Sequence, residues 1–578
     1  MTRGAPLRVA VALQPGRQPR WIAELLGDLA QSQDAALTCV VSLDVPAGRP
    51  RNGEAWPAHW LYGLYRGIDR RVFPVRPDPF EPVDVGSLLR GLPTLSLDAG
   101  AVHDRREVCA AALAAVAAQR VDVVLWLSPT APVALPSEVA AHGVWWYAHG
   151  GADLEPGAPA GVWEVLEDSP VTPVTLYATS ADGTARAVGR SHMRTQRISV
   201  NRNRARCYQK SIALVIRALR ALRERGAVAD AAATPAPSAR PPDDSVTRRG
   251  VPTNGETFVR LARIGAKYVG RRLTRGASPG DWFVAYGFGS DGARSHADPS
   301  HFTGFTQLRA PAGRFWADPF PAVVDGRYYI FVEEYVYSTE KGHIAVLDVT
   351  PDVAEPRAVP VLDRDYHLSY PFIFRWQGEH YMVPESVHNQ TVEMYRATHF
   401  PHAWVPHATL LENVRAVDAT LAEVNGRWWM FTAIGQERAD GWSDWNEELH
   451  LYHAPSPFGP WTPHRRNPVK SDVRGSRPAG RLFERAGELY RPAQDCAERY
   501  GRAILINRVV TLDTEDFREM PVSRISPTWA PKLVGTHTLN HAGGLTVIDG
   551  RVGRPWLPLP GLIRASASDR RRLPSPGR

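Results

Sequence analysis

The sequence predicts a multidomain protein in which an α/β (Rossmann-type) domain is followed by an all-β propeller of five blades. Three observations predict this order. Short apolar runs alternate with helical patterns over residues 7–223, as is typical of a sheet covered by helices. Residues 227–250 are rich in Ala, Pro, Ser and Asp without apolar periodicity, as expected of a linker. From residue 315 onward, a β-hairpin pattern recurs five times.

The α/β domain is predicted over residues 1–226. It opens with a β-α-β unit, since apolar runs at Leu7–Leu13 and Ala36–Leu43 flank a helical pattern at Trp21–Ala30. That order predicts a parallel sheet, because parallel strands need a crossover connection between them. The remaining expected elements are a helix at Val108–Ala118, strands at Val121–Leu127, Val144–Tyr147 and Val174–Ala178, and a closing helix at Asn203–Arg223.

Between the two domains we expect a linker at residues 227–254 and a connecting helical segment at residues 255–280. Phe258–Leu273 has a basic amphipathic pattern, which we interpret as an adaptor helix lying against the propeller. Trp282–Ala285 begins the β region and is a candidate to complete the last blade. Gly287–Gly292 matches GxGxxG, but turn-rich sequence follows instead of a helix, so we predict no dinucleotide site there.

The propeller is predicted over residues 281–560, followed by a basic disordered tail at residues 561–578. Phe315–Glu334 reads as a strand, an Asp-Gly turn and a second strand, which is the sequence form of a β-hairpin. Further copies begin at Tyr370, Asp418, Arg477 and, more weakly, His541. Copies spaced by about 45 to 70 residues, each with room for further strands, are typical of propeller blades.

The repeat predicts where polar side chains gather. The first strand of each blade lines the central channel, so the starts of the copies should meet at one mouth, and each second strand returns there. The starting positions are Asp318, Tyr370, Asp418, Arg477 and His541, and the returning positions are Glu333, Glu385, Ala433 and Gln494. A ring of carboxylates around a narrow mouth would push their pKa values apart.

Such a ring suits glycosidic chemistry, which needs one protonated acid and one ionised carboxylate across the sugar. We predict Asp318, Glu385 and Asp418 as the catalytic residues. The candidate substrate-binding residues are Trp316, Glu333, Tyr370, Arg477, Gln494, Asp495, Asn540, His541 and Trp442. Arg477 and His541 could offset the negative charge or bind an anionic substituent such as a phosphate. Ion pairing between blades is the alternative role for Glu333, Glu334 and Glu385.

The amino-acid composition indicates which kinds of binding partner and which cellular location to expect. The net charge of +8 is dispersed, so a solvated surface is favoured over binding to nucleic acid or to an anionic membrane, and no nucleic-acid-binding motif is present. The four cysteines are widely spaced and suggest neither a zinc site nor disulfides. The first apolar run is too short for a secretory signal, and no stretch reaches the ~18 apolar residues of a membrane span. We therefore expect a cytoplasmic protein. The cofactor is unknown, no metal ligand is predicted because no ligand spacing is diagnostic, and a metal at the channel mouth and the oligomeric state stay open.

The first domain resembles the formyltransferase family in the order VDVVLWLS, LPSEVAAHGVWWYAHG and APAGVWEVLEDSPVTPVTLYA. The resemblance implies the fold of enzymes that transfer a formyl group from a folate carrier to an amine. Their signature is Asn-x-His with a later Asp. Here Tyr147 stands in place of the Asn, His149 matches the His, and Asp182 is the candidate Asp. A tyrosine cannot supply the amide that stabilises an oxyanion, so the resemblance implies a remnant of the site rather than an active formyltransferase.

The second domain resembles the five-bladed arabinanase, xylosidase and invertase-type glycoside hydrolases. It is also similar to the N-terminal domain of plant glucosamine inositolphosphorylceramide transferases, through RFWADPFP, YPFIF, MVPES, VDATL and HTLNHAGG. The resemblance implies that Asp318 is the base or nucleophile and that Asp418 tunes the acid. Glu385 is the candidate acid, although inverting family members place theirs in a later blade, where this chain has Gln494 and Asp495.

We therefore predict a carbohydrate-active protein that acts on a glycan precursor or sugar conjugate, by hydrolysis or transfer, in surface-glycan metabolism. Two alternatives stay open. One is an amino-sugar N-formyltransferase with an accessory propeller, and the other is a non-catalytic glycan-binding scaffold.

Overall fold

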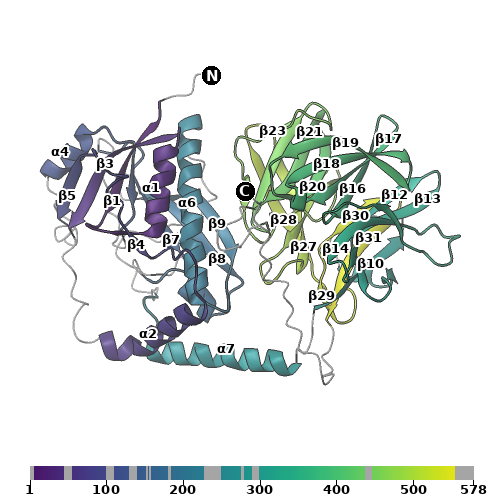
Figure 1. Cartoon of the computed structure of the whole chain (residues 1–578), viewed down its shortest axis with the longest axis horizontal. Coiled ribbons are helices and arrows are strands. Elements are labelled where there is room, and N and C mark those ends of the chain that lie inside the picture. Colours follow the sequence, from purple (N-terminus) through teal and green to yellow (C-terminus); the bar gives the residue numbers. More distant parts are fainter. Residues whose placement is uncertain are drawn as a thin grey trace. The chain divides into compact units, whose positions relative to one another are not determined.

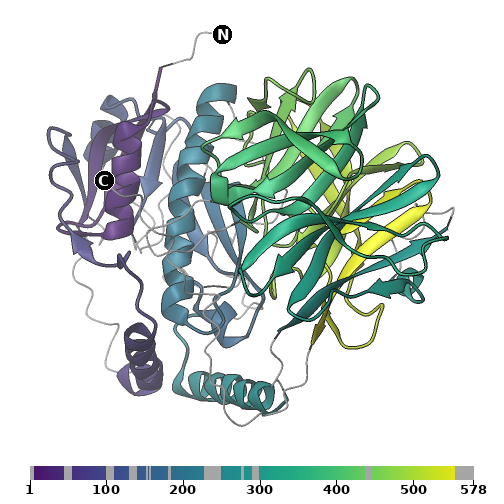
Figure 2. The same cartoon turned by 45° about the vertical axis from the view of Figure 1, so that its right-hand side comes forward.

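The computed structural model describes residues 5–44, 55–98, 110–128, 139–151, 154, 158–179, 184–226, 249–274, 279–289, 299–435 and 445–553. The chain forms two compact units, Met1–Ala266 and Lys267–Arg578 (Figures 1 and 2). The division falls within helix α7 (Asn254–Thr274). The predicted linker lies almost entirely outside the described residues, as does the predicted tail.

The first unit is built on a seven-stranded sheet with the order β5-β3-β1-β6-β7-β8-β9. These strands are β5 (Thr94–Asp98), β3 (Ala35–Asp44), β1 (Leu7–Leu13), β6 (Val123–Trp126), β7 (Val144–His149), β8 (Val171–Thr179) and β9 (Ala185–Arg194). A separate short pair joins β2 (Gln18–Pro19) to β4 (Pro82–Val83). The helices are α1 (Arg20–Gln31), α2 (Ala55–Val72), α4 (Ala110–Ala118), α5 (Val162–Leu166) and α6 (Val200–Arg225).

The predicted parallel sheet is correct for β5, β3, β1, β6 and β7. It is wrong for β8, which runs antiparallel to both β7 and β9. Residues 150–170 join β7 to β8, and five of them form α5.

Alternation along β1 explains how helices cover both faces of the sheet. Val9, Val11 and Leu13 pack in one cluster with residues of α1 and α6, whereas Ala10 and Ala12 pack on the other face with Val116 of α4. Successive side chains of a strand point to opposite faces, so a continuous apolar run marks a strand that is buried on both sides.

The second unit consists of five sheets, which confirms the predicted five-bladed propeller. The first blade contains β12 (Arg314–Val324), β13 (Arg327–Val336), β14 (Lys341–Asp348) and β15 (Val359–Leu362). The second contains β16 (Ser369–Trp376), β17 (Glu379–Ser386), β18 (Thr391–His399) and β19 (Ala403–Glu412). The third contains β20 (Ala416–Val424), β21 (Arg427–Ile434), β22 (Glu448–Ala454), β23 (Thr462–Pro463) and β24 (Lys470–Ser471). The fourth contains β25 (Phe483–Arg485), β26 (Glu488–Asp495), β27 (Ala503–Leu512) and β28 (Phe517–Ile525).

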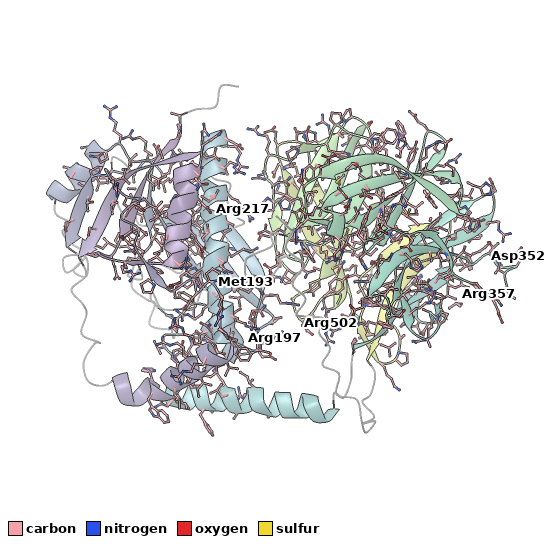
Figure 3. All side chains as sticks on the ribbon, viewed as in Figure 1. Met193, Arg197, Arg217, Asp352, Arg357 and Arg502 are labelled. Carbon is pink, nitrogen blue, oxygen red and sulfur yellow. The ribbon has the colours of Figure 1, made fainter. Side chains whose placement is uncertain are left out.

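The fifth blade draws strands from both ends of the unit. It combines β10 (Pro279–Phe288) and β11 (Thr306–Leu308) with β29 (Leu533–Gly535), β30 (Leu539–Ala542) and β31 (Leu545–Gly553). β10 pairs antiparallel with β31, which confirms the expectation that Trp282–Ala285 completes the last blade. Two 3₁₀ turns, η1 (Pro299–Phe302) and η2 (Val387–Asn389), complete the elements. Figure 3 shows Asp352 and Arg357 projecting from the loop between β14 and β15 at the rim of the propeller.

Glycines at two predicted motifs have structural roles. In the first hairpin, Asp325 and Gly326 have φ values of 50° and 77°, as the type I′ turn between two twisted strands requires. In the GxGxxG match, a Cβ on Gly287 would lie 2.5 Å from the ring of Phe305, so that glycine allows close packing.

A buried ion cluster ties the third blade to the fourth. Arg491 of β26 is 0% exposed and donates to both carboxylate oxygens of Glu519 on β28, at 2.7 and 2.8 Å. Lys470 of β24 donates to the same carboxylate at 2.7 Å. Burial disfavours the charged carboxylate, but Arg491 and Lys470 outweigh it and lower the pKa of Glu519 to about 2.

Candidate active site

A repeated backbone irregularity positions three of the predicted residues. Asp318, Tyr370 and Asp418 have φ values of 51°, 45° and 55°, which non-glycine residues seldom adopt. Each lies where the register of its hairpin shifts, as in a β-bulge. The paired residues Ala317 and Glu333, Ser369 and Glu385, and Val417 and Ala433 are each 16 positions apart. The repeat alignment read from the sequence is therefore correct for these three blades.

Hydrogen bonds link the inner strands of neighbouring blades. The backbone N–H of Tyr370 donates to Oδ2 of Asp318 at 3.3 Å, and its hydroxyl hydrogen-bonds Thr420 at 2.8 Å. The N–H of Gly480 in turn donates to the Tyr370 hydroxyl at 2.8 Å. The Asn540 amide donates to the carbonyl of Pro319 at 2.9 Å, which returns the chain of contacts to the first blade.

Asp418 is held by two side chains of the fourth blade. The Arg477 guanidinium binds it through both oxygens, at 2.6 and 3.2 Å, and the Gln494 amide donates to Oδ2 at 2.9 Å. Arg477 also reaches Glu385 at 3.4 Å and lies 4.8 Å from the ring centre of Tyr500. One buried cation thus bridges two of the three predicted catalytic carboxylates.

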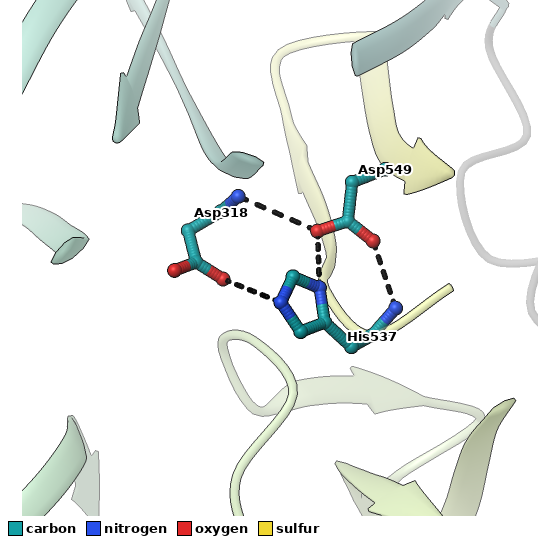
Figure 4. A group of neighbouring side chains, drawn as sticks. All are labelled: Asp318, His537 and Asp549. Carbon is teal, nitrogen blue, oxygen red and sulfur yellow. Dashed lines mark hydrogen bonds and ion pairs between the residues drawn. The ribbon is translucent and has the colours of Figure 1, made fainter. Parts of the chain in front are cut away.

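Asp318 has partners from the fifth blade (Figure 4). Thr538 donates its hydroxyl proton to Oδ1 of Asp318 at 2.7 Å. The His537 imidazole lies between two carboxylates, with Nε2 at 3.6 Å from Asp318 and Nδ1 at 2.5 Å from Asp549. The imidazole also stacks on Trp282, with 4.0 Å between ring centres and 12° between planes. The stacking on Trp282 holds the ring with its Nε2 side toward Asp318.

Burial and neighbouring charges give the ionisable groups of the site different pKa values. Burial, reinforced by the neighbouring carboxylates, raises the pKa of Glu333 and of Glu385 well above the usual value. Burial also raises the pKa of Asp318, to about 6, although His537 opposes the increase. For His537, burial favours the neutral ring, but Asp549 and Asp318 outweigh it and raise the pKa. Near neutral pH the site therefore combines protonated and ionised groups.

The structure brings together eight of the predicted residues. They are Asp318, Glu333, Tyr370, Glu385, Asp418, Arg477, Gln494 and Asn540. Trp316 is instead buried between strands, and its indole N–H donates to Glu334 at 3.0 Å. Asp495 follows Gln494 on the strand, so it points to the other face and pairs with Arg524 at 3.0 Å. Trp442 lies outside the described residues.

His541 was wrongly placed at the mouth. It pairs with Thr546 beside the Gly543–Gly544 turn, at the closed end of its hairpin. The fifth hairpin is shorter than the others, so the channel end falls where Asp549 donates its N–H to the carbonyl of Thr538. The sequence reasoning consequently missed Thr538, His537 and Asp549. Aligning HTLNHAGG by its Gly-Gly turn, rather than by its last histidine, would have found them.

The remnant residues of the first unit are engaged in its core. The Tyr147 hydroxyl donates to the carbonyl of Ser211 at 2.8 Å, and His149 Nε2 lies 2.7 Å from the Ser211 hydroxyl. The His149 ring also packs on Tyr208, with 4.4 Å between centres. Burial, aided by Arg204, lowers the pKa of His149 to about 3, so the ring is neutral. Asp182 lies outside the described residues.

One group of residues at the site could hold a cation. Ligand atoms of Asp318, His537 and Asp549 all lie within 4.8 Å of one another. Carboxylate and imidazole ligands of this kind suit several divalent metals. Asp549 already occupies Nδ1 of the ring, so a cation would be held by Nε2 of His537 and the two carboxylates.

The matches to known proteins fall on the part of the chain that forms the site. Residues 298–529 match the family model of glucosamine inositolphosphorylceramide transferase 1, N-terminal. The rice (Oryza sativa subsp. japonica) protein of that name is 37% identical over 216 residues, and the Arabidopsis thaliana protein is 36% identical over 222 residues. The matches cover 36% and 38% of this chain, and each covers 28% of the plant protein.

Solved structures with a similar fold are glycoside hydrolases. A family 117 enzyme from Zobellia galactanivorans has 12% identity and a TM-score of 0.30, covering 47% of this chain and 90% of its own. A GH43_1 enzyme from Xanthomonas citri has 12% identity and a TM-score of 0.31, covering 45% and 92%. These values are too low to bear on function. At the sequence level, the propeller unit is similar to the N-terminal region of the plant glucosamine inositolphosphorylceramide transferases, and the chain spans about 28% of their length.

Proposed function

We propose that the propeller is a carbohydrate-active enzyme unit that cleaves or transfers a glycosyl group of a sugar conjugate. The observation that carries this proposal is the buried set of carboxylates with separated protonation states at the meeting point of the blades. The relatives are named as transferases of glucosamine inositolphosphorylceramide, which supports a sugar conjugate as the substrate class. The match to part of those proteins leaves the sugar and the acceptor open.

Two carboxyl groups, those of Glu385 and Asp318, have different roles in the proposed reaction. Glu385, whose pKa is raised by burial, keeps a proton near neutral pH and donates it to the leaving oxygen as the glycosidic C–O bond breaks. Asp318 accepts the proton of the attacking water or hydroxyl group as the new C–O bond forms. Arg477, bound to Asp418, orients Glu385 through its 3.4 Å contact. One C–O bond breaks as another forms, and the proton that Glu385 gives up is matched by the one that Asp318 accepts, so no further reactant is needed.

A panel of 4-nitrophenyl glycosides, including glucosaminides, xylosides and arabinofuranosides, tests the proposal by release of 4-nitrophenol. Transfer from the nucleotide forms of the same sugars would be followed by mass spectrometry. Glu385→Gln should lower turnover of methyl glycosides of the same sugars by about 100-fold or more, because it removes the proton donor but keeps the shape. The 4-nitrophenyl glycosides carry a good leaving group that needs little protonation, so their turnover should decrease much less. Undiminished turnover of the methyl glycosides by this variant would rule out Glu385 as the acid.

A glycan-binding scaffold is the second candidate. It is favoured by the partners that already occupy the site: both oxygens of Asp318 accept hydrogen bonds, and Asp418 is bound by Arg477 and Gln494. A scaffold would bind the sugars of the panel, measured by calorimetry, without turning them over.

We infer that the first unit is formyltransferase-like in fold but does not transfer formyl groups. Tyr147 and His149 are both engaged by Ser211, so neither is directed at a substrate carbonyl. The amino-sugar N-formyltransferase alternative is therefore disfavoured.

We expect no saturable binding of 10-formyltetrahydrofolate by calorimetry, and His149→Ala should leave turnover of any glycan substrate unchanged. The His149 ring is buried and neutral, so it offers no charged group to the folate. Folate binding that is lost in the His149 variant would restore the formyltransferase alternative.

A further inference from the structure

Helix α2 of the first unit presents an apolar stripe to solvent. Trp60, Leu64, Ile68 and Val72 recur every four residues and are 50%, 52%, 52% and 59% exposed. Residues at this spacing lie on one side of a helix. The stripe is about 18 Å long at 1.5 Å per residue.

The opposite side of α2 attaches it to the domain, where Tyr62 packs in an apolar cluster with Val162, Val165, Leu166 and Val200. Tyr62 and Asp69 are buried there, and Asp69 accepts hydrogen bonds from Ser199 at 3.1 Å and from the N–H of Asn201 at 2.6 Å. A helix on a water-soluble domain usually buries its apolar side and exposes its polar side. α2 buries Tyr62 in this way but also carries a second apolar side that is exposed, so the stripe is an additional apolar surface on a well-attached helix.

The start of α7 also exposes apolar side chains. Phe258 and Val259 are 66% and 45% exposed, whereas Arg260 turns inward to Glu167 at 3.0 Å and lies 4.9 Å from the ring centre of Trp163. The segment is tied to α2, because the N–H of Leu61 donates to Asn254 at 2.9 Å. Both helices lie at the same edge of the first unit in Figures 1 and 2. We call Trp60, Leu64, Ile68, Val72, Phe258 and Val259 the α2–α7 surface.

The exposed charge on these two helices is mainly positive, with Glu256 as the acidic exception at the start of α7. Arg71, three residues after Ile68, and Arg263, four residues after Val259, are both exposed. Arg70 is exposed as well and pairs with Asp78 at 2.7 Å. The one acidic residue of α2, Asp69, is buried on the other side of the helix. An apolar stripe with Trp and aliphatic residues beside arginines is the pattern of a helix that lies in the interface of an anionic membrane.

We propose that the α2–α7 surface docks on an anionic lipid bilayer, with its apolar side chains among the acyl chains and its arginines at the headgroups. The helices would lie in the membrane plane, and among the described helices none is long and apolar enough to cross a membrane. A second copy of this chain is a poorer occupant, because two arginine-bearing faces would repel each other. This proposal is independent of the chemistry assigned to the propeller.

Vesicle co-sedimentation of the full chain tests the docking. The vesicles are phosphatidylcholine alone, or phosphatidylcholine with about one-quarter phosphatidylglycerol, at low and physiological salt. The full chain should sediment with the anionic vesicles and not with the neutral ones, less strongly as salt rises. Leu64→Ser combined with Ile68→Ser should weaken that binding at least about tenfold, because each removes an apolar side chain from the acyl region.

The matched control is Met520→Ser combined with Val522→Ser, which removes two aliphatic side chains, each 51% exposed, from β28 of the propeller. It should bind like the unmodified chain. Three results would overturn the proposal: no sedimentation with anionic vesicles, equal binding by the Leu64 and Ile68 double variant, or a dimer by light scattering that this variant abolishes. The last result would identify a second copy as the occupant.

Discussion

Replacing Asp318 by Asn is expected to lower turnover by at least about 100-fold, the usual scale for the loss of general base catalysis. The amide has nearly the same shape but cannot accept a proton from the attacking group. Because the pKa of Asp318 is about 6, kcat/KM of the unmodified protein should fall as pH decreases below about 6. The variant should lack that acidic limb.

The same substitution should leave stability unchanged or higher at neutral pH. The folded-state pKa of Asp318, about 6, exceeds the ordinary value of 3.8, so its stabilising contribution is complete below pH 3.8 and is lost as pH rises through about 6. Asn carries no charge to bury, so the variant should gain relative stability over that window.

The measurements are a pH–rate profile and thermal unfolding at pH 4 and pH 7. Asp348→Asn is a suitable control, because Asp348 pairs with Arg327 on neighbouring strands away from the site. It should keep full turnover. Full activity of Asp318→Asn together with a large decrease in Tm would show that Asp318 is a structural anchor and would favour the scaffold.

Glu519→Gln is expected to lower the free energy of unfolding by about 3 to 5 kcal/mol, the cost of breaking a buried ion pair. Arg491 is fully buried, so the variant leaves its charge uncompensated. The pKa of Glu519 is about 2, below the ordinary 4.5. Its contribution is therefore complete above pH 4.5 and is lost as pH decreases through about 2.

Urea unfolding followed by tryptophan fluorescence at pH 7 and pH 3 would measure this effect, and the difference between the variant and the unmodified protein should be smaller at pH 3. Glu515→Gln provides a matched control in the neighbouring turn, since the Arg465–Glu515 pair is 42% and 62% exposed. Loss of an exposed pair should cost less than about 1 kcal/mol. Coincident unfolding curves for Glu519→Gln and the unmodified protein at pH 7 would mean that the ion cluster adds no net stability.

The hairpin repeat made the propeller predictable. Strand-turn-strand patterns depend on local sequence, so the positions of Asp318 and Asp418 followed from counting along each copy. The fifth copy differs in length, and counting from its last histidine placed His541 at the wrong end of the hairpin. Asp495 was misassigned because strand alternation turns it to the opposite face from Gln494.

Features that depend on distant contacts were harder to predict. The antiparallel course of β8 is seen in its pairing with β7 and β9, which apolar periodicity does not reveal. Helix α2 was not predicted, although its apolar residues recur at helical spacing; that they face solvent could not be inferred from the sequence. The fifth-blade partners of Asp318 come from residues more than 200 positions away, where sequence spacing gives no guide.

Pairing of β10 with β31 also has a consequence for biosynthesis. β10 leaves the ribosome more than 250 residues before β31, a delay of about 10 to 50 s at ordinary translation rates. During this interval, the nascent fifth blade has an open edge that could pair with another chain, so a chaperone that shields extended segments would be useful. His537 and Asp549 emerge with the same late segment. The nascent chain therefore gains the fifth-blade partners of Asp318 only when the ring closes, and the complete carboxylate site forms only after β31 has been made.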